Sequence, residues 1–134
     1  MKSATLSLDH PIIFLEDFGN PDVQIPEYSE QLLTAATPSC ISVRVVCYVD
    51  GEVTLRLMRE ASEVNLDRLV NVFDGTITTP TRKVAAVTSE NEKAVEIEVP
   101  HEVTRMRVFV NRIDFPDEVL VVAGAHPSSE TTGD

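Results

Sequence analysis

The stretch ISVRVVCYVDGEVTLRL, residues 41–57, decides the fold class of this chain. Apolar residues recur at every second position on both sides of Asp50-Gly51, a period typical of strands with one buried face. Asp50-Gly51 is a turn signal, so the stretch predicts a β-hairpin. A three-residue loop, Asp50 to Glu52, sets Val49 opposite Val53 and keeps the apolar faces together, whereas a two-residue loop separates them.

A second alternating pattern covers residues 95–110. Pairing Ile97 with Met106 aligns its two apolar faces. The same register sets two glutamates opposite two arginines, Glu98 with Arg105 and Glu96 with Arg107. Because hydrophobic matching and charge matching select one register, the pattern predicts another hairpin around Pro100.

Alternation and turn signals predict more strands along the chain. These are Ala4–Asp9, Ile12–Leu15, Gly75–Thr79, Lys83–Thr88 and Glu118–Ala123. Pro80 has no backbone N–H to donate, so the strand around it should lie at a sheet edge or break there.

One segment departs from the period of two. Pro26 is followed by Tyr28, Leu32, Leu33 and Ala36 at helical spacing, which predicts a short helix that ends at Pro38. The stretch Asn65–Phe73 fits either a helix or a strand. The sequence as a whole therefore predicts an all-β fold with one short helix, a β-sandwich of mainly antiparallel strands.

The length of 134 residues suits one domain. We expect a single β-sandwich domain over residues 1–123, followed by a flexible C-terminal tail of small and polar residues over 124–134. No internal repeat or linker divides the chain.

Acidic residues dominate the charge, with 22 Asp and Glu against 11 Lys and Arg, which gives a net charge of −11. Such a chain cannot neutralise a run of phosphates or dock on an anionic membrane, so we expect no nucleic-acid partner and no membrane partner. No apolar stretch approaches the roughly 18 residues of a membrane span, and no secretory signal opens the sequence. We therefore expect a cytoplasmic protein.

The residue types of common active sites are present without the spacing that those sites need. Cys40 and Cys47 lie an odd number of residues apart in one expected strand, so their side chains point apart and we expect free thiols. His10, His101 and His126 fit no zinc spacing, and the chain lacks nucleophile and phosphate-loop motifs. We expect no metal, no cofactor and no catalysis.

The most informative feature is a run of acids near the N-terminus that contains no lysine or arginine. Acids interleaved with aromatic residues are what a surface needs to steer and hold a basic partner. The candidate partner-binding residues are Glu16, Asp17, Phe18, Asp22, Glu27, Tyr28 and Glu30. A solvated loop and helix face is the alternative explanation. The run Glu90-Asn91-Glu92 has the same plain explanation, as a hairpin loop.

Four segments follow one another in a recognisable order: Leu6 to Phe14, an acidic Pro-containing loop with a helix before Cys40-Ile41-Ser42-Val43, Thr78-Thr79-Pro80 to Val84, and Glu96 to Pro100. Over roughly residues 5–123, this order resembles the competence protein J family of nuclease inhibitors. The family has a tryptophan followed by Thr-Asp-Glu at the helix start, where this chain has residues 26–30, PEYSE, and no tryptophan. The resemblance implies a small β-sandwich that binds and neutralises a nuclease.

These observations predict a noncatalytic protein that occludes a basic partner, such as a nuclease, through its acidic surface. The alternative is a β-sandwich that binds a small ligand in an apolar cavity between its sheets or at one end. A structural oligomer is a third possibility, for which Val46 on the polar face of its strand is the hint. The sequence leaves the partner and the oligomeric state open.

Overall fold

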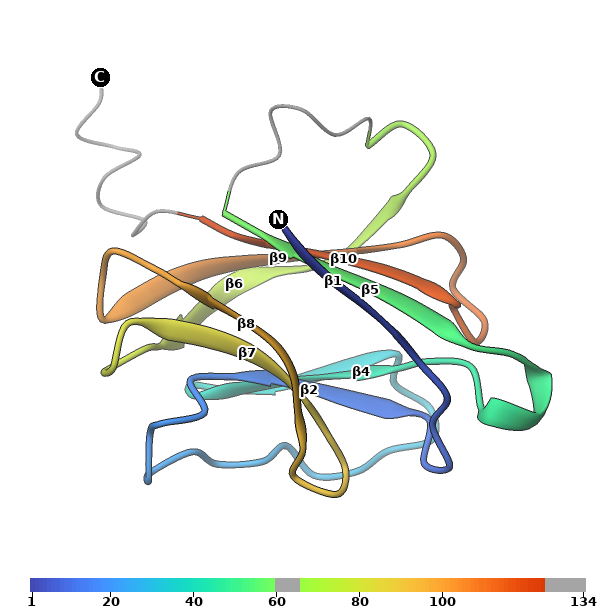
Figure 1. Cartoon of the computed structure of the whole chain (residues 1–134), viewed down its shortest axis with the longest axis horizontal. Coiled ribbons are helices and arrows are strands. Elements are labelled where there is room, and N and C mark those ends of the chain that lie inside the picture. Colours follow the sequence, from blue (N-terminus) through green and yellow to red (C-terminus); the bar gives the residue numbers. More distant parts are fainter. Residues whose placement is uncertain (60–65, 125–134) are drawn as a thin grey trace.

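The computed structural model, which describes residues 1–59 and 66–124, consists of two packed five-stranded β-sheets (Figure 1). Sheet A has the order β1-β5-β10-β9-β6, with β1 (Lys2–Leu6), β5 (Val53–Met58), β6 (Val70–Thr78), β9 (Val103–Val110) and β10 (Glu118–Ala123). Sheet B has the order β3-β4-β2-β7-β8, with β2 (Ile12–Glu16), β3 (Thr34–Thr37), β4 (Cys40–Arg44), β7 (Lys83–Thr88) and β8 (Lys93–Glu98). Apart from the parallel pair β5–β10, the described strand pairs are antiparallel. The predicted sandwich is confirmed.

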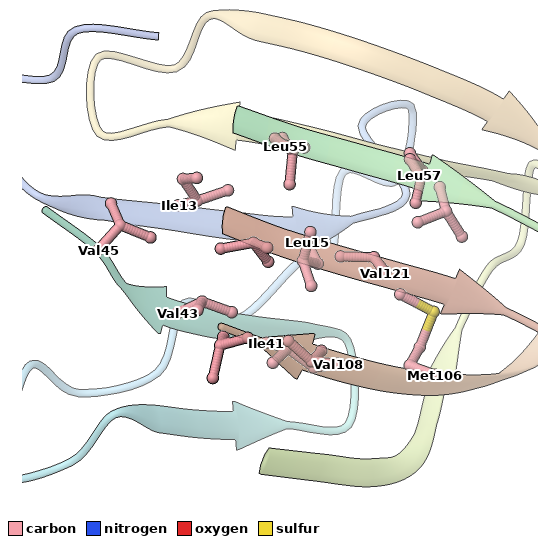
Figure 2. Close-up of a cluster of buried hydrophobic side chains, with 14 of the residues drawn as sticks. Ile13, Leu15, Ile41, Val43, Val45, Leu55, Leu57, Met106, Val108 and Val121 are labelled. Atoms are coloured by element: carbon pink, nitrogen blue, oxygen red, sulfur yellow. The ribbon is translucent and has the colours of Figure 1, made fainter. Parts of the chain in front are cut away.

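The core lies between the sheets and is built from alternate residues of each strand (Figure 2). Ile13 and Leu15 of β2 point inward with at most 1% of their surface exposed, while Phe14 between them points to the outer face. Leu55 and Leu57 of β5 meet them from sheet A with no exposed surface. Burial of these branched apolar faces is what stabilises the fold.

The hairpin predicted around Asp50–Glu52 is wrong. β4 lies in sheet B, whereas β5 lies in sheet A between β1 and β10. The Val45 N–H donates to the loop before β2 and the Val46 N–H to the loop before β10, so the chain crosses between the sheets here. The 3₁₀ turn η1 (Tyr48–Asp50) then leads into β5. This crossing buries Val45 and Val46 together, which explains the apolar residue on the expected polar face.

The predicted pairing of Ile97 with Met106 is also wrong. β8 pairs with β7 in sheet B, and β9 pairs with β6 and β10 in sheet A. The charges have other partners: Arg105 binds Asp74 at 2.8 Å, and Lys93 binds Glu96 at 3.2 Å. A chain that crosses between sheets buries the same alternating faces as a hairpin, so the two cannot be distinguished from periodicity.

The short helix predicted after Pro26 is absent. In its place the chain runs irregularly and then forms β3. Strand residues hold this backbone extended: the Arg44 guanidinium donates to the Glu30 carbonyl, and the Arg44 N–H donates to the Leu33 carbonyl at 2.8 Å. Tyr28 and Leu33 share no buried face, so the helical spacing has no apolar stripe to bury.

Three further expectations are settled in the described residues. The ambiguous stretch that ends at Phe73 becomes strand from Val70, while Asn65 lies outside the described residues. Pro80 lies in the connection where β6 ends and β7 begins in the other sheet, which confirms the predicted break. Cys40 and Cys47 are free thiols, as predicted, but Cys47 lies beyond the end of β4 and not in the same strand as Cys40. The expected tail beyond Gly124 lies outside the described residues.

Candidate functional site

The acidic segment, residues 16–30, begins at the end of β2 and lies over the outer face of sheet B (the blue trace along the lower edge of Figure 1). Two bonds to the β3–β4 turn fix its middle. The Gln24 N–H donates to the Ser39 hydroxyl at 2.7 Å, and the Thr37 hydroxyl donates to the Gln24 carbonyl at 2.5 Å. Since backbone groups are bonded on both sides of Gln24, the segment has a defined path without regular secondary structure.

Four of the seven candidate residues are exposed. Asp22, Glu27 and Glu30 face solvent, and their carboxylates make no ion pair or hydrogen bond with any described residue. Tyr28 lies among them with 64% of its surface exposed. The neighbouring Ile25, 53% exposed, was missing from the candidate residues. Unpaired acids are thus interspersed along the segment with the exposed apolar side chains of Ile25 and Tyr28.

Asp17 is instead fully buried and bonded within the chain. Its carboxylate accepts from the Thr81 N–H at 2.6 Å, the Thr81 hydroxyl at 2.5 Å and the Gly19 N–H at 3.1 Å. These bonds tie the start of the acidic segment to the connection between β6 and β7. Asp17 therefore shapes the surface from beneath and offers no charge to a partner.

Glu16 is 7% exposed and lies on the outer face of sheet B, directly between Cys40 of β4 and Ala85 of β7. Burial, with a smaller contribution from Asp17, raises the pKa of the Glu16 carboxyl. Burial, with a smaller contribution from Glu16, raises the pKa of the Cys40 thiol to about 12. The thiol therefore stays protonated and neutral, and it adds no second negative charge beside the carboxyl.

Phe18, the remaining candidate, is half-buried. The ammonium of Lys93 lies 5.8 Å from the centre of its ring, within the range of a cation–π contact. Lys93 begins β8 and also binds Glu96, so the contact joins the acidic segment to the far edge of sheet B.

Three surface pockets open around the β7–β8 turn, and Ser89 lines all of them. Two of them also include residues of the acidic segment. The Tyr28 pocket, about 400 Å³, includes His10, Ile12 and Glu90. The Glu16 pocket, about 250 Å³, has mostly apolar walls formed by Phe14, Glu16, Ile25, Val87, Thr88, Ser89 and Asn91. A third, of about 190 Å³, continues toward β1. A pocket of about 570 Å³ elsewhere is lined by both lysine and glutamate side chains.

Sequence reasoning missed the contribution of the β7–β8 turn. The run Glu90-Asn91-Glu92 is a hairpin loop, as predicted, but it also borders the pockets beside the acidic segment. His10, which fits no zinc spacing, is exposed and lines the Tyr28 pocket. Residues 90–92 are far from the acidic segment in sequence, so the signal that could have found them is the strand order of sheet B.

The small-ligand alternative predicted a cavity between the sheets or at one end. Between the sheets, the described apolar side chains meet and fill the interior (Figure 2). In the described parts of the chain, no group of three or more His, Cys, Asp or Glu side chains is placed to hold a metal ion. None of the described segments forms a helix with the length and hydrophobicity of a bilayer crossing.

No protein family and no curated protein matches this sequence. Solved structures do match the fold. The crystal structure of ComJ from Bacillus subtilis, an inhibitor of the DNA degrading activity of NucA, superimposes with a TM-score of 0.68. The fold of this chain is similar to that of ComJ. The match covers 94% of this chain and 96% of ComJ at 10% sequence identity. The product of crocagin biosynthetic gene J matches with a TM-score of 0.59 and 12% identity, over 92% of this chain and 96% of that one.

The likeness to ComJ confirms the resemblance that the segment order suggested, at the level of the fold. It extends over nearly the whole of both chains. At such low identity it carries over no individual residue, so the role of the acidic segment stays a prediction.

Proposed function

We propose that this protein is a noncatalytic inhibitor that binds a basic nuclease and occludes its nucleic-acid cleft. One observation carries the proposal. The carboxylates of Asp22, Glu27 and Glu30 are exposed and unpaired, and they lie in the same segment as the exposed ring of Tyr28. The fold supports it, because ComJ, which shares the fold, inhibits the DNA degrading activity of NucA.

In this mechanism the exposed carboxylates occupy the places of nucleic-acid phosphates in the basic cleft. The net charge of −11 attracts the partner over a distance, and the exposed Tyr28 and Ile25 then contribute apolar contact. Asp17 and Phe18 hold the acidic segment in place from behind. No side chain of this protein takes part in bond breaking, because blocking access is sufficient for inhibition.

The test starts with tagged protein, which is incubated at low salt with lysate of its source cells and then eluted by a salt step. A released nuclease is identified, purified and assayed for DNA degradation with and without the protein. Inhibition that follows saturable complex formation would support the proposal. A purified partner that is not a nuclease, or a nuclease that keeps full activity in the complex, would contradict it.

A further inference from the structure

Glu16 is a mostly buried residue whose carboxyl reaches the surface and has no partner in the described chain. Its side chain is more than nine-tenths buried and forms no hydrogen bond or ion pair with any residue in the described ranges. Asp17, the next residue, has three hydrogen bonds. An ionised carboxylate in an apolar environment is costly unless a donor or cation meets it. The Glu16 carboxyl therefore has oxygen acceptors that no donor of the described chain meets.

The unused carboxyl is not sealed inside the protein, because it lines the Glu16 pocket beside Phe14, Ile25 and Val87. The pocket opens at the β7–β8 turn through Ser89 and Asn91. Most of the wall surface is apolar, and the one acidic residue in the wall, Glu16, lies at the end of β2. Two basic side chains have described contacts to the segment, and both are engaged elsewhere: Lys93 by Phe18 and Glu96, and Arg44 by the Glu30 carbonyl.

We propose that the Glu16 pocket receives one lysine or arginine side chain of the basic partner protein, with the aliphatic stem against Phe14 and Ile25 and the cationic end at Glu16. Such side chains combine an apolar stem with a charged head, which is the pattern of the pocket walls. The volume of about 250 Å³ lies below the range of roughly 300–1,000 Å³ of small-molecule sites, and suits a single side chain. Glu90 and Glu92 near the opening add to the attraction.

This inference rests on the proposed function, since it specifies one contact of the same complex. It predicts that the complex needs Glu16 more than any single exposed carboxylate. Loss of a buried charge partner at an interface weakens binding far more than loss of a charge at its rim. With the purified partner, we expect Glu16→Gln to raise the dissociation constant at least about tenfold and Asp22→Asn to raise it less than about threefold.

A test that needs no nuclease uses N-acetyl-lysine amide and N-acetyl-arginine amide, titrated into the protein while amide NMR shifts are recorded. N-acetyl-norleucine amide has a similar stem without the charge and is the control compound. We expect shifts at Phe14, Ile25 and Val87 with the two cationic probes and much smaller shifts with norleucine. Equal shifts with all three compounds, or shifts confined to other surfaces, would overturn the proposal.

Two variants separate the charge from the shape of the pocket. Glu16→Gln removes the charge, and Ser89→Trp fills the opening at an exposed turn position while Glu16 stays in place. Both should lose the lysine response, and Asp50→Asn, at an exposed residue that lines none of the three pockets, should keep it. An unchanged response in folded Ser89→Trp would overturn the proposal even if Glu16→Gln failed to fold. Micromolar binding of the free amines would overturn it too, by assigning the pocket to a small amine. Neither of these results would affect capture and inhibition of a nuclease. The pocket proposal can therefore fail while the inhibitor proposal stands.

Discussion

At the scale of residues, Glu16 and Asp17 show how adjacent acids acquire opposite roles. Asp17 points toward Thr81 and receives three hydrogen bonds, so it stabilises the start of the acidic segment. Glu16 points to the outer face of sheet B and receives none from the described residues. Alternation along the chain points the two side chains to opposite faces. The neighbours on each face then decide whether a carboxyl finds hydrogen-bond donors.

Glu16→Gln should change how stability depends on pH. Burial raises the pKa of Glu16 in the folded protein above the ordinary 4.5, so the folded state holds this proton to higher pH than the unfolded state does. Stability from this group is then highest at low pH and falls as pH rises from about 4.5 through the folded pKa. We expect urea unfolding to show that Glu16→Gln gains stability over the wild type as pH rises through that window. Parallel pH profiles of the two proteins would contradict this assignment.

Asp17→Asn should destabilise the protein by about 1.5–3 kcal/mol. The asparagine amide keeps one oxygen acceptor, but its NH₂ group replaces the other. Since both Thr81 donors now meet the carboxylate at 2.6 Å or less, the NH₂ group would face a donor and could not bond to it. Asp22→Asn makes the same chemical change at an exposed site and should cost less than about 0.5 kcal/mol. Urea unfolding of both variants at neutral pH checks the prediction, and equal costs would show that Asp17 contributes little.

At the scale of elements, the acidic segment is held by strand side chains and not by regular hydrogen bonding of its own. Arg44, at the end of β4, donates to the Glu30 carbonyl and lies 6.0 Å from the centre of the Phe115 ring. This arginine therefore clamps the C-terminal part of the segment between sheet B and the β9–β10 connection. A held segment loses less conformational entropy on binding than a free one.

Arg44→Ala should loosen the segment without unfolding the sandwich. We expect amide exchange around Leu32, whose N–H donates to the Ser29 carbonyl, to become about tenfold faster, because the clamp contributes roughly 1–2 kcal/mol. Arg107→Ala is the matched control, since Arg107 is also half-buried in a strand and its Nε also has no described partner. Acceleration of the same amides by both variants would show a general loss of stability.

At the scale of the whole molecule, the sandwich is a rigid support for a strongly negative surface. The two sheets bury apolar side chains against each other, so the core does not depend for its stability on the exposed acids Asp22, Glu27 and Glu30. The charge is then available for attraction of a partner, which acts over distance and weakens with salt.

Charge reversal at the acidic segment should slow association with the captured nuclease. We expect Glu27→Lys with Glu30→Lys to lower the association rate constant about tenfold at low salt, with the difference shrinking as salt rises. Asp50→Lys with Glu102→Lys changes the net charge equally, at exposed residues that border none of the three pockets. Stopped-flow association over a salt series distinguishes the two. Equal slowing would assign the attraction to net charge alone.

The sequence by itself determined the class of fold. Apolar alternation along the chain specified which faces are buried, and the break at Pro80 followed from the missing N–H of proline. It also identified the acidic segment, including Glu16 and Tyr28, because charge and aromatic content are visible in composition. Resemblance to an inhibitor family could be seen in the order of segments and is matched by the fold of ComJ.

Only the tertiary structure decided which strands pair. The alternating stretches at Asp50–Glu52 and around Pro100 cross between sheets, and a crossing buries the same faces as a hairpin, so local pattern could not separate them. The expected helix after Pro26 was lost to long-range bonds from Arg44 and Ser39. The same long-range packing made Asp17 a structural anchor and placed Glu16 in a pocket, because burial and partners depend on residues that are distant in the sequence.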